Sequence, residues 1–133
     1  MKYSQCKTEQ QFKMEWIRRN KDKYLAIFPI ETEETVKGFP DVLAIHEFNK
    51  DMQTPYLLEF KKARNGVVEF QPTQPAFYKA NPKLFIYMLA LVEYKAKTYV
   101  ISLPSQIVMD CLKGKTRLDL RRFCTAEFEV EEE

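Results

Sequence analysis

Apolar residues at helical spacing open the chain and predict a helix there. Thr8 can cap its N-terminus, with Gln11 at the capping-box position. The apolar residues that follow are Phe12, Met14, Trp16 and Ile17. On a helical wheel with 100° per residue, the mean direction of these four side chains lies about 25° from that of Glu9 and about 145° from that of Glu15. We therefore expect Glu9 to point toward the sheet, and Glu15 to point outward, with Arg19 four residues after it.

The pattern then changes to short, β-branched and alternating runs that are typical of strands. Strands are predicted at 24–28, 41–45, 56–61, 67–70, 84–92 and 98–103. A turn is expected over 49–55, and Asn65-Gly66 is a strong signal for a hairpin that returns into 67–70. The run 84–92 is almost entirely apolar, which predicts a buried central strand with 98–103 beside it.

Two further helices are predicted among the later strands. Thr73 offers an N-cap and Pro75 a first turn for a short helix that ends near Ala80. Ser105 offers a cap for a last helix. Its apolar face is predicted from Ile107, Val108, Cys111 and Leu112. The order of elements predicts an α/β fold, a mixed β-sheet flanked by helices, in a single domain over 1–124.

Composition restricts the class of protein. The chain has 133 residues, 45% of them apolar and 14% aromatic, which suits one soluble domain with one core. No apolar run approaches the roughly 20 residues that cross a bilayer, and no secretory signal is visible, so no membrane association is expected. The three cysteines are scattered, which is typical of free thiols in a reducing compartment and predicts a cytoplasmic protein.

Charge is unevenly distributed along the chain. Five of the 19 acidic residues lie in the segment 125–133, which we expect to be an acidic C-terminal tail. Residues 1–124 hold all 21 basic residues against 14 acidic ones, a net charge of +7. This charge favours a polyanionic partner, although a solvated basic surface is the other interpretation.

Two short segments carry residues suited to catalysis. Gly38-Phe39-Pro40-Asp41 places a carboxylate where a loop enters a strand, and Glu59-Phe60-Lys61 lies in the next strand. Because side chains alternate along a strand, Glu59 and Lys61 share one face. Two carboxylates on adjacent strands suit Mg²⁺, and a neighbouring lysine can orient or deprotonate a water molecule and neutralise charge that develops on a phosphate.

This combination resembles the PD-(D/E)xK nuclease superfamily through Pro40-Asp41 and Glu59-Phe60-Lys61. It is most similar to the virus-type replication-repair nucleases (VRR-NUC) and the Holliday junction resolvases. In those, a Gly-x-Pro-Asp turn precedes the second carboxylate and the lysine, and a glutamine opens the next helix. The resemblance implies a restriction-endonuclease-like fold and a Mg²⁺- or Mn²⁺-dependent, structure-selective endonuclease that hydrolyses DNA, with branched DNA among the expected substrates. It also implies a homodimer that serves DNA recombination or repair in a bacterial or phage-infected cell.

The resemblance assigns roles to the matching residues. Asp41 and Glu59 would bind Mg²⁺, with the carbonyl group of Phe60 as a third ligand. Lys61 would activate or position the attacking water molecule.

For two further site residues the sequence leaves an alternative residue open. Gln74, in the first turn of the predicted helix, would complete the catalytic set, with Gln71 as its rival. A glutamate of the first helix would add a metal ligand, and the helical face favours Glu9 over Glu15. The alternative for both glutamines is that the side chain caps the backbone at the helix start or is simply a polar group in contact with solvent.

Other residues have simpler interpretations. His46, the only histidine, alternates onto the face opposite Asp41 and is expected to be structural. The basic stretches 61–64 and 113–117, with Arg121-Arg122, could hold DNA phosphates, although a solvated face is the alternative for the second stretch. The competing function is a non-catalytic nucleic-acid-binding module of the same fold, and a nuclease of flaps or single strands is the alternative within the enzyme class.

Overall fold

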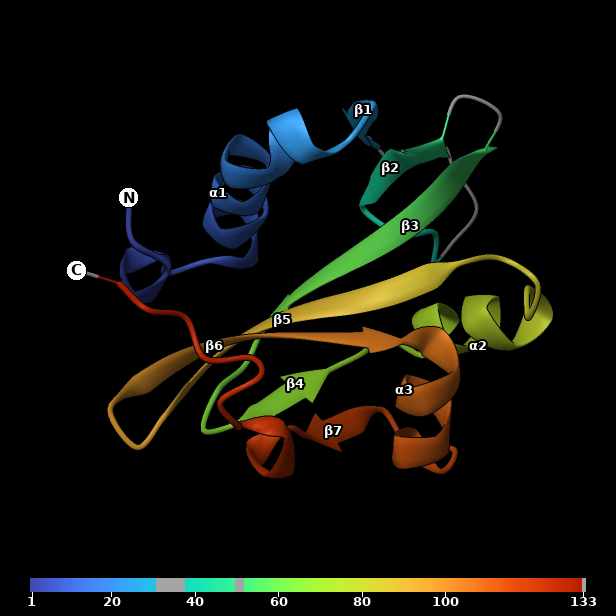
Figure 1. The fold of residues 1–133 in the computed structure, drawn as a ribbon. Helices are drawn as coiled ribbons and strands as arrows, with labels where there is room; N and C mark the ends of the chain where they lie inside the picture. Colours follow the sequence, from blue (N-terminus) through green and yellow to red (C-terminus); the bar gives the residue numbers. More distant parts are fainter. Residues whose placement is uncertain (31–37, 50–51, 133) are drawn as a thin grey trace.

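The computed structural model describes residues 1–30, 38–49 and 52–132. Its centre is a five-stranded mixed sheet in the order β1-β2-β3-β5-β6 (Figure 1). The strands are β1 (Ala26–Pro29), β2 (Val42–Asn49), β3 (Met52–Lys62), β5 (Ile86–Tyr94) and β6 (Lys97–Pro104). Strands β3 and β5 are parallel, and the other neighbours are antiparallel. The expected α/β fold with a mixed sheet is confirmed.

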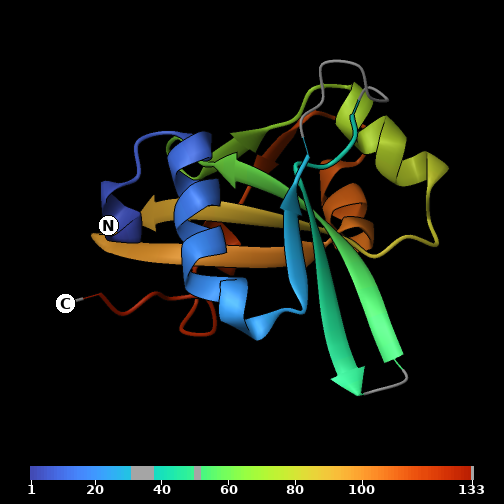
Figure 2. The same cartoon turned by 90° about the horizontal axis from the view of Figure 1, so that it is seen from above.

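Helices cover both faces of this sheet. Helix α1 (Glu9–Asn20) lies on one face, whereas α2 (Thr73–Ala80) and α3 (Ser105–Leu112) lie on the other (Figures 1 and 2). The second face also carries a two-stranded sheet of β4 (Val67–Glu69) and β7 (Arg117–Asp119). Short 3₁₀ turns complete the chain: η1 (Tyr3–Gln5), η2 (Lys21–Lys23) and η3 (Arg121–Phe123).

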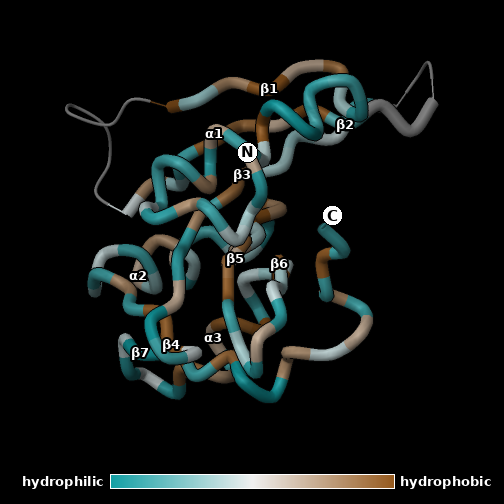
Figure 3. The backbone as a smooth tube through the Cα atoms, turned by 90° about the vertical axis from the view of Figure 1, so that its left-hand side faces the viewer, coloured by the Kyte–Doolittle hydropathy of each residue, from teal (hydrophilic) through white to brown (hydrophobic). Residues whose placement is uncertain are grey.

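The two faces have separate apolar cores, and β3 contributes to both by alternation. Phe60 packs under α1 with Phe12 and Trp16, and its ring centroid lies 5.3 and 5.5 Å from theirs. Leu57 points to the other face, into the core formed with α2, α3, β4 and β7. Strand β5 is interior and covered on both sides, which explains its continuous apolar run (Figure 3) and confirms the prediction of a central strand.

Helix ends follow the sequence signals only in part. Thr8 caps α1, since its Oγ1 accepts from the backbone N–H of Gln11 at 3.1 Å, as predicted. The other two N-caps are wrong by one residue. Proline precedes each helix as its N-cap and offers no side-chain acceptor: Pro72 for α2 and Pro104 for α3.

The buried face of α3 also differs from the prediction. Val108 and Leu112 are buried as expected, but Ser105 is buried with them, whereas Ile107 is 41% exposed. These buried positions are three and four residues apart, and Ile107 does not belong to that row.

Asn65 and Gly66 form the expected tight turn, with positive φ at both residues. Arg64 and Val67 exchange backbone hydrogen bonds of 2.9 and 3.0 Å across it. Beyond the turn, the prediction of a hairpin with β3 is wrong, because β4 pairs with β7 in a separate sheet. Strand β7 is too short to show an alternating pattern, so the sequence analysis missed it.

The turn predicted over 49–55 is too long. Strand β2 continues to Asn49 and β3 begins at Met52, with a register shift near the end of β2. Residues 50 and 51 lie outside the described part of the chain.

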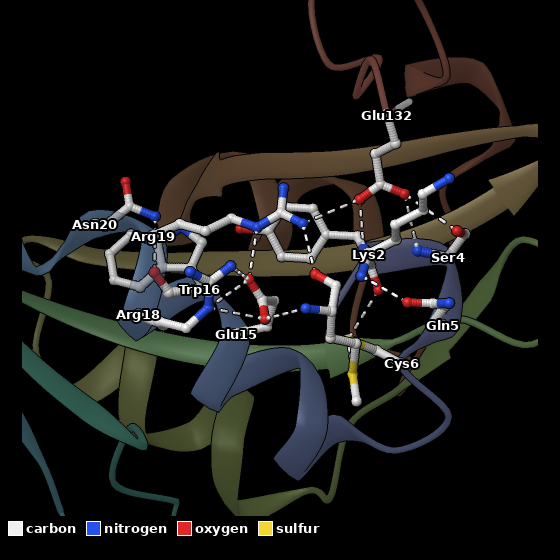
Figure 4. A network of polar contacts seen from close by, with 12 residues as sticks. Lys2, Ser4, Gln5, Cys6, Glu15, Trp16, Arg18, Arg19, Asn20 and Glu132 are labelled. Carbon is white, nitrogen blue, oxygen red and sulfur yellow. Dashed lines mark hydrogen bonds and ion pairs between the residues drawn. The ribbon is translucent and has the colours of Figure 1, made fainter.

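The prediction that Glu15 points outward is wrong. Its side chain is 6% exposed, whereas Met14, which was counted toward the apolar face, is 49% exposed. Glu15 is buried because Arg18 and Arg19 neutralise it, the latter with an Nε–Oε2 distance of 2.7 Å (Figure 4). Apolar periodicity alone therefore misplaced the inner face, which runs through Phe12, Glu15 and Trp16.

The acidic tail, as far as residue 132, lies against the domain. The backbone N–H of Val130 donates to the carbonyl of Thr98 on β6 at 2.8 Å. Glu132 accepts from the backbone N–H of Tyr3 and pairs with Arg19 at 3.2 Å (Figure 4). These contacts place negative charge beside β6 and the N-terminus.

The described residues contain no helix long and apolar enough to cross a membrane. The three cysteines, Cys6, Cys111 and Cys124, are free thiols, in agreement with their scattered spacing.

Candidate active site

The register of β2 and β3 brings the two predicted carboxylates together. Val42 lies opposite Leu58, so Asp41, one residue earlier, lies opposite Glu59. Opposed residues of an antiparallel pair share a face. The backbone N–H of Asp41 donates to the carbonyl of Leu58 at 2.9 Å, and Asp41 Oδ2 accepts from the N–H of Phe60 at 3.0 Å. The Asp41 carboxyl also lies close enough to that of Glu59 to raise its pKa.

The loop before Asp41 is held against α2. Gly38 has a φ of +83°, and a Cβ atom there would lie 2.0 Å from the carbonyl oxygen of Thr73. Phe39 makes an edge contact with Phe77 of α2, with ring centroids 5.2 Å apart. Only glycine permits this approach, which couples the Asp41 turn to the start of α2.

Glu59 and Lys61 are deeply buried beneath α2 and β4. Their exposed fractions are 2% and 6%, lower than the partly covered face expected from the sequence. Gln74 joins them: its Nε2 donates to Glu59 Oε1 at 2.9 Å, and its Oε1 accepts from Lys61 Nζ at 2.8 Å. The Gln74 side chain therefore links the acid to the lysine.

Gln71 contributes differently from Gln74. Its side chain is exposed, and its backbone N–H donates to Gln74 Oε1 at 2.9 Å. The structure thus brings Gln74 into the cluster and gives Gln71 the part of a backbone support. Phe70, which the sequence analysis did not single out, places its ring centroid 4.9 Å from Lys61 Nζ, a cation–π contact.

Burial and the neighbouring charges act strongly on the Glu59 carboxyl. Burial, followed by the hydrogen bond and the charge of Asp41, raises the pKa of Glu59 to about 10, while Lys61 acts in the opposite direction. Without a cation, Glu59 therefore holds a proton at neutral pH. A divalent cation between the two carboxyls would replace that proton, and this donor chemistry fits Mg²⁺ or Mn²⁺.

Tyr78 is a member of the cluster that the sequence analysis missed. It is 3% exposed, and its hydroxyl has no hydrogen-bond partner among the described residues. Burial raises its pKa well above the usual value, and the charges of Glu59 and Asp41 raise it further. Tyr78 follows Gln74 by one helical turn on α2, so the i, i+4 spacing in the sequence could have identified it.

Glu9 does not join the acid pair. It is exposed at the start of α1 and lines a groove with Lys62 and Arg64, and its charge has a smaller effect on Glu59 than that of Asp41. Within residues 1–30, 38–49 and 52–132, no group of three or more His, Cys, Asp or Glu side chains is arranged to hold a metal ion. A metal would therefore depend on Asp41, Glu59 and main-chain oxygens.

Glu15 and His46 lie away from the cluster. Glu15, the alternative to Glu9, is a buried residue of α1 whose carboxylate forms ion pairs with Arg18 and Arg19. His46 makes an edge contact with the ring of Tyr24, with centroids 5.6 Å apart, on the α1 side of the sheet, as expected for a structural residue.

Comparison of the chain with protein-family models, curated proteins and solved structures finds no match in any of the three. The chemistry of the cluster is therefore argued from its residues: two adjoining carboxyls, a buried lysine, and a glutamine that contacts both sides.

Proposed function

We propose that the chain is a metal-dependent endonuclease that hydrolyses DNA phosphodiester bonds, of the PD-(D/E)xK type. The observation that carries the proposal is the buried Glu59, with the partly buried Asp41 opposite it just before β2 and the buried Lys61 beside it on one face of the sheet. A polyanionic substrate suits the net charge of +7 over residues 1–124.

Asp41 and Glu59 would hold the cation, with the main-chain carbonyl of Phe60 as a further ligand. Mg²⁺ binds to proteins through one or two carboxylates and keeps several of its water molecules, so a pair of acids is sufficient. When bound, such an ion polarises a phosphoryl oxygen and lowers the pKa of a bound water molecule.

The chain's own residues contribute orientation and charge. The Lys61 ammonium is fixed between the Gln74 oxygen and the Phe70 ring, so its position costs no reorganisation during the reaction. Gln74 also donates to Glu59, so it keeps Glu59 and Lys61 at a constant separation. Because the cluster is buried, these charges act in a medium of low dielectric constant, where they are stronger than in water.

A catalytic role explains the acid pair better than binding alone. Two adjoining carboxylates repel each other and repel a nucleic acid, and burying Glu59 costs free energy. A module that only binds DNA gains nothing from them, whereas a metal-dependent nuclease requires them.

The direct test is cleavage of a panel of end-labelled DNAs: a four-way junction, a flap, a linear duplex and a single strand. Each is incubated with the purified protein in Mg²⁺, Mn²⁺ or Ca²⁺. We expect cleavage in Mg²⁺ or Mn²⁺ that is lost in Asp41→Asn and in Glu59→Gln. Metal-independent binding without cleavage of any DNA, or full activity in both variants, would overturn the proposal.

Metal binding has a test that does not depend on activity. We expect Mg²⁺ to raise the melting temperature of the wild-type protein, because it binds only the folded site. The gain should be absent in Asp41→Asn. An equal shift in both proteins would place the metal elsewhere.

A further inference from the structure

A basic surface lies next to the cluster, on the outer side of the β4–β7 sheet and the loop that follows α3. We call it the basic ribbon. It consists of Lys62, Arg64, Lys113, Lys115, Arg117, Arg121 and Arg122. Two adjoining grooves contain these residues, and Arg117 lines both.

The basic ribbon is connected to the catalytic cluster through the backbone. The N–H of Phe70 donates to the carbonyl of Thr116 at 2.8 Å, which places the loop 113–116 beside the strand that leads to Gln71. The N–H of Gln71 in turn holds the Gln74 oxygen that accepts from Lys61. At the other end, Lys62 follows Lys61 directly on β3.

The ribbon's outward orientation is fixed by apolar anchors. Val68, Leu118 and Leu120 are buried in the core, so the alternating residues of β4 and β7 face solvent. Arg117 and Asp119 are accordingly exposed. Arg117 therefore stands on a supported strand, and Lys113 and Lys115 lie in the short loop that joins α3 to it.

Cations exceed acids on this surface. The two grooves are lined by the seven basic residues and by four acids, Glu9, Glu69, Asp110 and Asp119. Two of these acids form ion pairs, Glu69 with Arg117 at 3.4 Å and Asp119 with Arg121 at 2.5 Å. Within the described part of the chain, the other five basic residues form no ion pair. The acidic tail is directed elsewhere, with Glu129 at Lys97 and Glu132 at Arg19.

From this arrangement we propose that the basic ribbon binds the DNA backbone on one side of the scissile phosphate. The inference rests on the proposed nuclease function and adds the path of the substrate. The DNA strand would leave the cluster over Phe70 and Thr116 and continue along the loop 113–117 toward η3. Lys113 and Lys115 would contact phosphates there, whereas η2, which follows α1, would remain free of DNA.

The test compares two double variants with equal loss of charge. Lys113→Gln/Lys115→Gln alters the loop after α3. Lys21→Gln/Lys23→Gln alters η2, which follows α1 on the other side of the sheet, and all four lysines are exposed. Binding of a fluorescent 20-base-pair duplex and a 20-nucleotide single strand is measured in Ca²⁺ at several KCl concentrations. Melting curves check that both variants are folded.

We expect the loop variant to bind more weakly, with its log Kd–log[KCl] slope reduced by about one for each lysine, so by about two in all. The η2 variant should keep the wild-type slope. Equal slopes in the two variants would overturn the inference even if wild-type protein cuts DNA. Wild-type protein that binds neither DNA would instead overturn the proposed function.

Neutral methylphosphonate linkages, which remove single phosphate charges, would locate the path of the DNA strand on the protein. We place one at each of the four positions on either side of the cleavage site. Wild-type binding should weaken for linkages on one side only, and the loop variant should be insensitive to those same linkages. Sensitivity on both sides, or equal sensitivity in the loop variant, would contradict a one-sided path over the basic ribbon.

Discussion

Lys61 Nζ donates to Gln74 Oε1 at 2.8 Å, although the two residues belong to different elements and lie 13 positions apart in the chain. The contact fixes a buried cation next to the acid pair, where an unrestrained lysine would turn toward water. It also makes Lys61 and Gln74 the most informative positions to alter.

We expect Lys61→Met to lower the rate of DNA cleavage by a factor on the order of 10²–10³, because it removes one preorganised charge. Methionine retains much of the buried stem. DNA binding in Ca²⁺ should change little. Lys62→Met, one residue on and on the other face of β3, removes the same charge; it should weaken DNA binding but leave the single-turnover rate at saturating DNA unchanged. Equal single-turnover rates in the two variants would exclude a catalytic role for Lys61.

Gln74→Ala should lower the free energy of unfolding by about 1–3 kcal/mol, because Lys61 loses its acceptor inside the protein. Cleavage should slow as well, since Glu59 loses its donor. Gln71→Ala retains the backbone N–H and should have little effect on either property. Urea denaturation and single-turnover cleavage measure both, and a larger loss in Gln71→Ala would reverse the assignment.

The pH dependence of the free energy of unfolding should reveal the raised pKa of Glu59. Its pKa in the folded protein, about 10, is above the usual 4.5, so its contribution is fully present below pH 4.5 and is lost as pH rises toward 10. Glu59→Gln has no such loss. In EDTA, we expect the variant to gain stability relative to wild type as pH increases from 4.5 to 9. Parallel stability profiles from urea denaturation would contradict the raised pKa.

The contribution of Glu15 to stability should depend on pH in the opposite direction. The hydrogen bond from Arg18 lowers its pKa to about 2, against the usual 4.5. Its stabilisation is therefore present above pH 4.5 and disappears as pH falls toward 2. We expect Glu15→Gln to be less stable than wild type at pH 7, with the difference shrinking in acid. Glu127→Gln, an exposed change of the same kind, is the control, and an equal effect in both would refute the prediction.

Tyr78→Phe tests the hydroxyl that has no partner in the described structure. Removing it should leave the free energy of unfolding unchanged or raise it by about 1 kcal/mol, because no buried hydrogen bond is lost. Cleavage should slow by about tenfold if the hydroxyl donates to a substrate or water oxygen during turnover. Tyr94→Phe, at the end of β5, should change neither. A marked loss of stability in Tyr78→Phe would indicate a structural hydrogen bond instead.

Local physical rules already determined much of this protein. Thr8 capped the first helix because capping involves residues three positions apart. The continuous apolar run in β5 indicated a strand covered on both sides. Strand alternation placed Glu59 and Lys61 on one face, and the entry of Asp41 into the preceding strand made a carboxyl pair the natural expectation.

Only the tertiary structure decided what the pattern left open. Gln74 was distinguished from Gln71 by contacts that reach β3 across 13 and 15 residues. Glu15 is buried because Arg18 and Arg19 neutralise its charge, and a hydrophobicity scale does not take ion pairs into account. The pairing of β4 with β7 joins segments about 50 residues apart through backbone hydrogen bonds, which any sequence can form. Periodicity and capping depend on neighbours in the chain, whereas register, charge compensation and sheet pairing depend on which distant surfaces pack together.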